Sequence, residues 1–217
     1  MKKSLIAILV FVGISSGIKA QTIKGGLEAF VREHTVYPPY SLQNCIQGTV
    51  QISFKLDGKG LVYHSEIRNG IGTDLDQEAL RLIRMSSGKW TVPAGYDTAL
   101  VLKVPVSFSL SGYNCDLKSP QEISRAIAAY KVNEGLTNAV LNFYRNKEKG
   151  IFNEADEPKM LAIKKDLGYD DEYLQSKIQD AKAKLKQKDR QGACEDLLFV
   201  KNMGSPLADD LLKQYCN

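Results

Sequence analysis

The spacing of apolar residues changes once along this chain, near residue 116, and the change divides the chain into two folding units. Before it, residues 50–56 and 100–110 alternate between apolar and polar side chains, as strands with one buried face do. After it, apolar residues recur every three to four positions, which predicts helices alone. The pattern therefore predicts a small sheet at 36–112 and an all-helical unit at 119–217, with 21–35 as a separate N-terminal segment.

The first unit reads strand, strand, helix, strand. The turn that joins the first two strands is expected at Asp57-Gly58-Lys59-Gly60. Residues 74–85 then have helical spacing, with Asp74 as the expected N-cap and Gly88 after the end. This order predicts an α+β domain, a three-stranded antiparallel sheet with helices on one face.

The third strand, expected from Leu100 to Ser109, contains a proline in its middle. Because proline has no N–H, it is confined to edge strands and bulges, so the strand is expected at an edge of the sheet. Such a proline either marks a strand with a free side or blunts that side against unwanted pairing, and the direction of the Pro105 nitrogen decides between the two. The residues of this expected edge strand are Leu100, Val101, Leu102, Lys103, Val104, Pro105, Val106, Ser107, Phe108 and Ser109.

Trp90, the only tryptophan, lies between the helix and the third strand. A single large aromatic at such a position is expected to close the core over the helix end, and ligand stacking is the alternative.

The first twenty residues have the layout of a secretory signal peptide, with Lys2 and Lys3, a short apolar run at 4–14 and Ala20 before Gln21. The run is shorter than the roughly 20 residues that a membrane-spanning helix needs, and an uncleaved anchor is the alternative. We expect cleavage after Ala20 and a periplasmic location, with secretion or association with the cell envelope as alternatives. Three of the 29 Lys and Arg residues lie in this leader, so the mature chain, with 25 Asp and Glu, is nearly neutral and gives no indication of nucleic-acid binding.

Four cysteines in an exported chain predict two disulfides, and four buried free thiols are the alternative. Cys45 lies five residues before Val50 of the first strand and Cys115 lies five residues after Leu110. If those strands are antiparallel neighbours, both cysteines lie at one rim of the sheet. The ends of a helical hairpin also meet, so the predicted pairs are Cys45–Cys115 and Cys194–Cys216.

No catalytic motif is present: the chain has no Gly-x-Ser-x-Gly, His-Glu-x-x-His or P-loop sequence. The two histidines, His34 and His64, have no evident catalytic partner, and no cysteine spacing matches a zinc site. We therefore expect no enzymatic activity, no catalytic residue, no metal, no cofactor and no small-molecule substrate.

A set of residues occurs in a characteristic order and spacing within 36–110: Tyr37, Pro38, Gly48, Asp57, Gly58, Leu75, Asp76, Glu78, Ala79, Leu80, Trp90, Pro93 and Ala94. In this order and spacing, the segment resembles the C-terminal domain of TonB, the energy transducer of Gram-negative bacteria, in a form common in Bacteroidetes. The resemblance implies that the third strand, from Leu100 to Ser109, binds a short extended segment of an outer-membrane receptor as an added strand.

The chain departs from a working transducer because its apolar segment looks cleavable and no proline-rich spacer follows. Residues 21–36 would span only about 50 Å even when fully extended. The resemblance therefore implies a binding module without the connection to a motor.

In the second unit, Ser119, Pro120 and Glu122 predict a strong helix start. Residues 190–216 resemble the last unit of tetratricopeptide- or Sel1-like helical repeats, which suggests a capping hairpin or an adaptor surface. Two functions therefore remain open. One is a periplasmic module that captures a peptide of an outer-membrane transport protein. The other is an exported adaptor that forms a homodimer through the sheet edge and holds a partner on its helical half.

Overall fold

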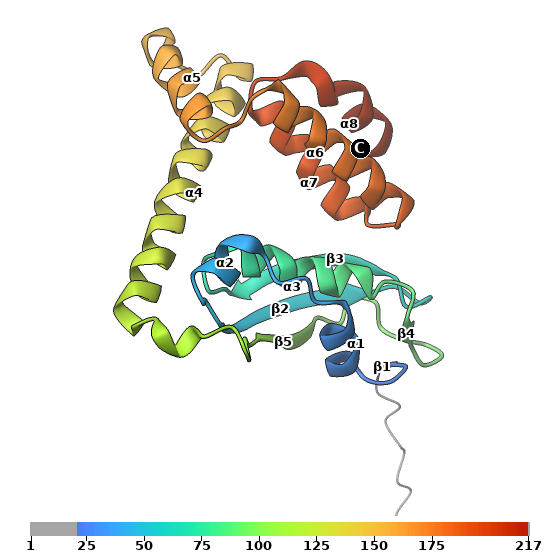
Figure 1. Cartoon of the computed structure of the whole chain (residues 1–217). Helices are drawn as coiled ribbons and strands as arrows, with labels where there is room; N and C mark the ends of the chain where they lie inside the picture. The colour runs from blue at the N-terminus through green and yellow to red at the C-terminus, as the bar shows by residue number, and fades with distance from the viewer. Residues whose placement is uncertain (1–20, 217) are drawn as a thin grey trace, which may run out of the picture.

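The computed structural model describes residues 21–216, so the predicted signal peptide lies outside the described residues. The α+β prediction is confirmed: a small antiparallel sheet with helices is followed by a helical region. Figure 1 shows the long helix α4 (Pro120–Glu148) as the connection between these two parts. We refer to residues 21–117 as the sheet half and to residues 119–216 as the helical half.

The sheet has three strands, β2 (Gly48–Leu56), β3 (Val62–Asn69) and β5 (Leu102–Phe108), in the order β3-β2-β5. Both pairings are antiparallel, and Gln51 of β2 lies opposite Pro105 of β5. The predicted neighbours and the predicted edge position of the third strand are therefore correct. The strand is shorter than predicted, because Leu100, Val101 and Ser109 lie outside it.

One face of the sheet packs against the helix α3 (Asp74–Met85) and forms a single apolar core. The alternation in β2 is the cause, since Val50, Ile52, Phe54 and Leu56 are all fully buried. Trp90 closes this core, as predicted: its ring centroid lies 5.2 Å from that of Phe54.

The sequence did not indicate the elements that precede the sheet. A two-residue strand β1 (Thr22–Ile23) pairs with β4 (Trp90–Thr91), and the helices α1 (Leu27–His34) and α2 (Pro39–Gln43) follow it. Ile23, Phe30 and Val31 are buried in the same core as the sheet, so residues 21–35 pack as part of the sheet half.

The predicted N-cap role of Asp74 is wrong, because Asp74 is the first residue of α3 and Thr73 occupies the cap position. The Asp74 carboxylate instead accepts hydrogen bonds from the Ser41 hydroxyl and from the backbone N–H of Tyr40. The backbone bond satisfies a free N–H group at the N-terminus of α2, a helix that has no side-chain cap of its own.

The helical half begins as predicted. The Ser119 side chain accepts from the Glu122 N–H and the Glu122 carboxylate accepts from the Ser119 N–H, which is a complete capping box. Its second apolar core, around Val140, Leu174, Leu197 and Met203, is separate from the core of the sheet half. The remaining elements are the 3₁₀ turns η1 (Cys115–Leu117), η2 (Glu154–Asp156) and η3 (Pro206–Ala208) and the helices α5 (Glu157–Asp166), α6 (Asp171–Lys186), α7 (Arg190–Asn202) and α8 (Asp209–Tyr215).

Both predicted disulfides are present. Cys45–Cys115 joins the segment before β2 to the turn after β5, with a Cα–Cα distance of 5.4 Å. Cys194–Cys216 joins α7 to the end of α8, with a Cα–Cα distance of 5.6 Å.

Candidate functional site at the edge of the sheet

Within residues 21–216, β5 has one long side that no other strand covers, because it is the last strand in the order β3-β2-β5. The direction of its backbone groups follows from Ser65 of β3, which lies opposite Phe54 of β2. Both the N–H and the C=O of Ser65 bond away from the sheet, to Gln191, so the pair is of the non-hydrogen-bonded type. Phe54 therefore directs its own N–H and C=O toward β5.

Because backbone groups alternate in direction along a strand, this assigns every residue of β5. Leu102, Val104, Val106 and Phe108 bond to β2, and Lys103, Pro105 and Ser107 face outward. The hydroxyls of Thr49 and Ser107 lie 2.9 Å apart across the ladder, which agrees with a close, non-hydrogen-bonded pair at that position.

The nitrogen of Pro105 thus points away from the sheet, and the ladder to β2 loses no hydrogen bond. The outward side offers the N–H groups of Lys103 and Ser107 and the carbonyls of Lys103, Pro105 and Ser107. None of these groups bonds to another residue within 21–216. The edge is therefore open, but it lacks the donor in its middle.

A groove of about 820 Å³ runs along this edge. One wall is α1, and the other is β5 with the loop that follows it. Near its base, the Tyr37 hydroxyl donates a 2.5 Å hydrogen bond to the Ile46 carbonyl. Burial and the nearby Asp74 carboxylate raise the pKa of Tyr37 to about 12, so this hydroxyl keeps its proton. The residues that line the groove are Leu27, Glu28, Val31, Arg32, Thr35, Tyr37, Val104, Pro105, Ser107, Phe108, Ser109, Leu110, Ser111 and Tyr113.

The helix α1, which forms this wall of the groove, was not predicted from the sequence. Leu27, Phe30, Val31 and His34 follow helical spacing, which is the signal that could have found it. Two exposed, oppositely charged side chains, Glu28 and Arg32, lie on this wall one helical turn apart.

The opposite long edge of the sheet, that of β3, is covered in its centre. Gln191 of α7 accepts from the Ser65 N–H at 2.8 Å and donates to the Ser65 carbonyl at 2.7 Å. The outward N–H and C=O groups of the central residue of β3 are therefore bonded. The outward backbone groups of β5 have no such partner within residues 21–216.

Most of the motif residues position the sheet half and do not line the edge. Leu75 and Ala79 are core residues, and Asp57 accepts from the N–H groups of Lys59 and Leu61 to hold the turn after β2. Asp76 accepts from the N–H groups of Ile71 and Gly72 and holds the turn before α3. Gly48 begins β2, Pro38 is the N-cap of α2, Gly58 lies in the turn, and Pro93 and Ala94 lie between β4 and β5.

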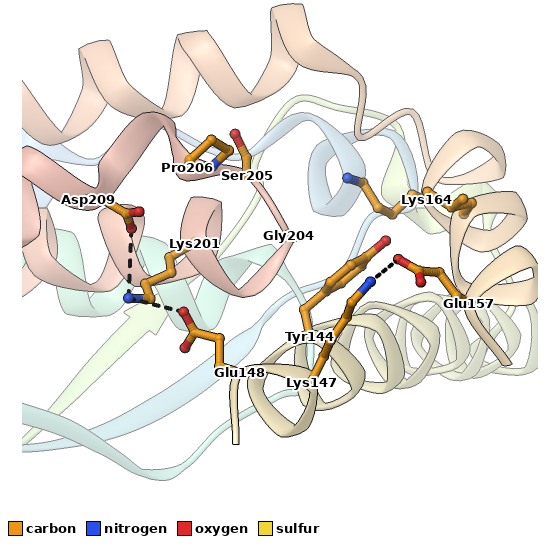
Figure 2. Close-up of a pocket in the computed structure, with 11 residues that line it drawn as sticks. Tyr144, Lys147, Glu148, Glu157, Lys164, Lys201, Gly204, Ser205, Pro206 and Asp209 are labelled. Carbon is orange, nitrogen blue, oxygen red and sulfur yellow. Dashed lines mark hydrogen bonds and ion pairs between the residues drawn. The ribbon is translucent and has the colours of Figure 1, made fainter. Parts of the chain in front are cut away.

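A second cleft, of about 520 Å³, lies in the helical half between α4, α5 and the end of α7 (Figure 2). Its lysines already have partners: Lys147 bonds to Glu157, and Lys201 lies 3.1 Å from Glu148 and 3.7 Å from Asp209. Lys164 donates to the Met203 carbonyl, and burial lowers its pKa. The charged groups of this cleft therefore already have bonding partners. The outward backbone groups of β5 are unbonded within residues 21–216, which makes the edge of β5 the stronger candidate for a binding site.

Two searches of residues 21–216 bear on other kinds of site. No group of three or more His, Cys, Asp or Glu side chains there is arranged to hold a metal ion. In the same residues, no helix combines the length and the apolar character that a membrane crossing requires.

Comparison with protein families identifies the sheet half. Residues 33–110 match the family model of the Gram-negative bacterial TonB protein C-terminal, which confirms the resemblance seen in the sequence. No curated protein and no solved structure gave a match. The match supports a TonB-like protein-interaction module, and it includes both β5 and the part of α1 nearest to Tyr37.

Proposed function

We propose that this protein binds an extended segment of an outer-membrane transport protein, in the periplasm, by adding it as a strand to the outer edge of β5. The observation that carries the proposal is the row of outward N–H and C=O groups from Lys103 to Ser107, which lies beside a groove. Main-chain hydrogen bonds supply affinity in this mode of binding, and the side-chain positions along the groove supply specificity.

The family match supports a protein partner. The sequence contains no recognisable catalytic motif, which favours a binding module over an enzyme. The predicted signal peptide supports export, with a mature chain that starts at or near Gln21. Mass spectrometry of the mature N-terminus tests this part, and a chain retained in inner membranes with Met1 would contradict it.

Ser107→Pro is expected to weaken binding of a receptor-derived peptide by about fivefold or more. The substitution removes one of the two outward N–H donors, and a hydrogen bond contributes about 1 kcal/mol. It leaves the ladder to β2 intact because the Ser107 N–H faces outward. Fluorescence anisotropy with labelled peptides from the N-terminal segments of outer-membrane receptors measures the change.

The matched control is Ser107→Ala, which keeps the N–H and loses only the hydroxyl contact with Thr49. Equal affinities for the Ala and Pro variants would contradict strand addition at this edge. Amide chemical shifts on peptide addition provide a second readout, and shifts confined to the helical half would count against the proposal.

Pro105→Val is expected to strengthen peptide binding by roughly fivefold, because it restores the missing donor in the middle of the edge. The same anisotropy assay measures it. Ser107→Val is the control, since it adds a β-branched side chain to the same face without adding a donor. If both valine variants bind alike, the gain comes from strand propensity and Pro105 does not blunt the edge.

A further inference from the structure

The carboxamide of Gln191 occupies the place that a residue of a neighbouring strand would take beside β3. It accepts from the Ser65 N–H at 2.8 Å and donates to the Ser65 carbonyl at 2.7 Å. These are the two hydrogen bonds that paired residues of adjacent antiparallel strands exchange. Gln191 therefore satisfies the edge of β3 with a side chain of the helical half.

An ion pair holds this contact in position, buried on the side of Arg84 and about half exposed at Glu195. Arg84 of α3, which is 6% exposed, donates to both carboxylate oxygens of Glu195, at 2.7 and 2.8 Å. The Nε atom of Arg84 donates to the Ser65 hydroxyl at 2.9 Å, and Gln191 donates to Glu195 at 3.1 Å. Ser65, Arg84, Gln191 and Glu195 thus form one connected network between the halves.

β3 depends on this contact because it lacks the protection that β5 has. Exposed strand edges are commonly protected by proline or lysine, and β5 contains Lys103 and Pro105 whereas residues 62–69 contain neither. The two irregularities in the β2–β3 ladder lie near its ends, so the stretch from His64 to Ile67 is regular. Gln191 bonds in the middle of that regular stretch.

The stretch is also complementary to itself. An antiparallel pair of two β3 strands centred on Ser65 places His64 opposite Glu66 and Tyr63 opposite Ile67, with no like charges directly opposed. In such a pair, the two Ser65 residues exchange the hydrogen bonds that Gln191 now makes.

We propose that α7 of the helical half is a releasable cap on β3, and that the uncapped edge binds the β3 edge of a second copy of this chain. The interface is separate from the outer edge of β5. Docking of α7 therefore controls whether the protein is a monomer or a dimer.

The test uses the full mature chain with Gln191→Ala and with the double substitution Gln191→Ala/Glu195→Gln. In Gln191→Ala, hydrogen exchange of the Ser65 N–H is expected to be about tenfold faster at low protein concentration, as measured by NMR. In the double variant, analytical ultracentrifugation is expected to show a concentration-dependent dimer, with the Ser65 N–H protected again at high concentration.

Gln179→Ala, on the exposed surface of α6, is the control and is expected to exchange and sediment as the parent chain does. Unchanged Ser65 exchange in Gln191→Ala would overturn the cap. A double variant that stays monomeric would overturn the dimer interface, and so would a dimer that Ser107→Pro abolishes, because that dimer would use β5.

Discussion

Replacing Trp90 by alanine is expected to lower the free energy of unfolding of the sheet half by about 3–5 kcal/mol. Trp90 is 9% exposed, and its indole packs against Phe54 and donates its N–H to the Ser86 hydroxyl at 2.7 Å. Its backbone also pairs with Ile23. The substitution removes a large buried ring where α3 ends and β4 begins, and urea denaturation followed by circular dichroism measures the loss.

Trp90→Phe is the matched control for the alanine variant. It keeps an aromatic ring against Phe54 and loses the indole N–H, so the expected loss is about 1–2 kcal/mol. Ser86 remains satisfied in this variant because its hydroxyl donates to the Ile83 carbonyl at 2.6 Å. An alanine variant no less stable than the phenylalanine variant would show that the ring does not close the core.

The sequence predicted those parts of the fold that local chemistry determines. Alternation in 50–56 and 100–110 identified two strands because one face of each is buried. The proline at 105 placed its strand at an edge because proline has no N–H to donate to a second neighbouring strand. The capping box at Ser119 located the start of α4 to the residue, since two orphan N–H groups there need partners.

The parts that failed depend on partners far away in the sequence. Asp74 looked like a helix cap, but Ser41 and Tyr40, more than thirty residues earlier, take its carboxylate. Gln191 and Ser65 are 126 residues apart, and no local pattern indicates that they bond. At the candidate site, the sequence predicted the strand β5 but not the helix α1. A helix as short as α1 repeats its apolar spacing only about twice, so the signal is weak.

The two edges of the sheet are protected in different ways, and the difference bears on function. β5 carries a proline that removes one donor and leaves the others exposed, while β3 has its central residue bonded to Gln191. A binding module of this kind needs one accessible edge, since a second open edge would invite pairing between copies. By bonding to the centre of β3, the helical half leaves β5 as the open edge of the sheet, which is the edge that the proposed function requires.

Opening the Cys45–Cys115 bridge by serine substitutions is expected to lower the free energy of unfolding of the sheet half by about 4 kcal/mol. The bridge closes a loop of 70 residues that contains the whole sheet, so the reduced chain gains conformational entropy on unfolding. Chemical denaturation of the double serine variant measures the change.

Cys194→Ser/Cys216→Ser is the control, because that bridge closes only 22 residues in the helical half and is expected to contribute about 3 kcal/mol there. Peptide affinity separates the two variants further. The first bridge fixes the turn after β5, where the Leu110 N–H donates to Gln47 at 2.6 Å and the following loop lines the groove. Loss of that bridge is therefore expected to weaken peptide binding, while loss of the second leaves it unchanged. Equal effects of both variants on affinity would contradict a binding site at the edge of β5.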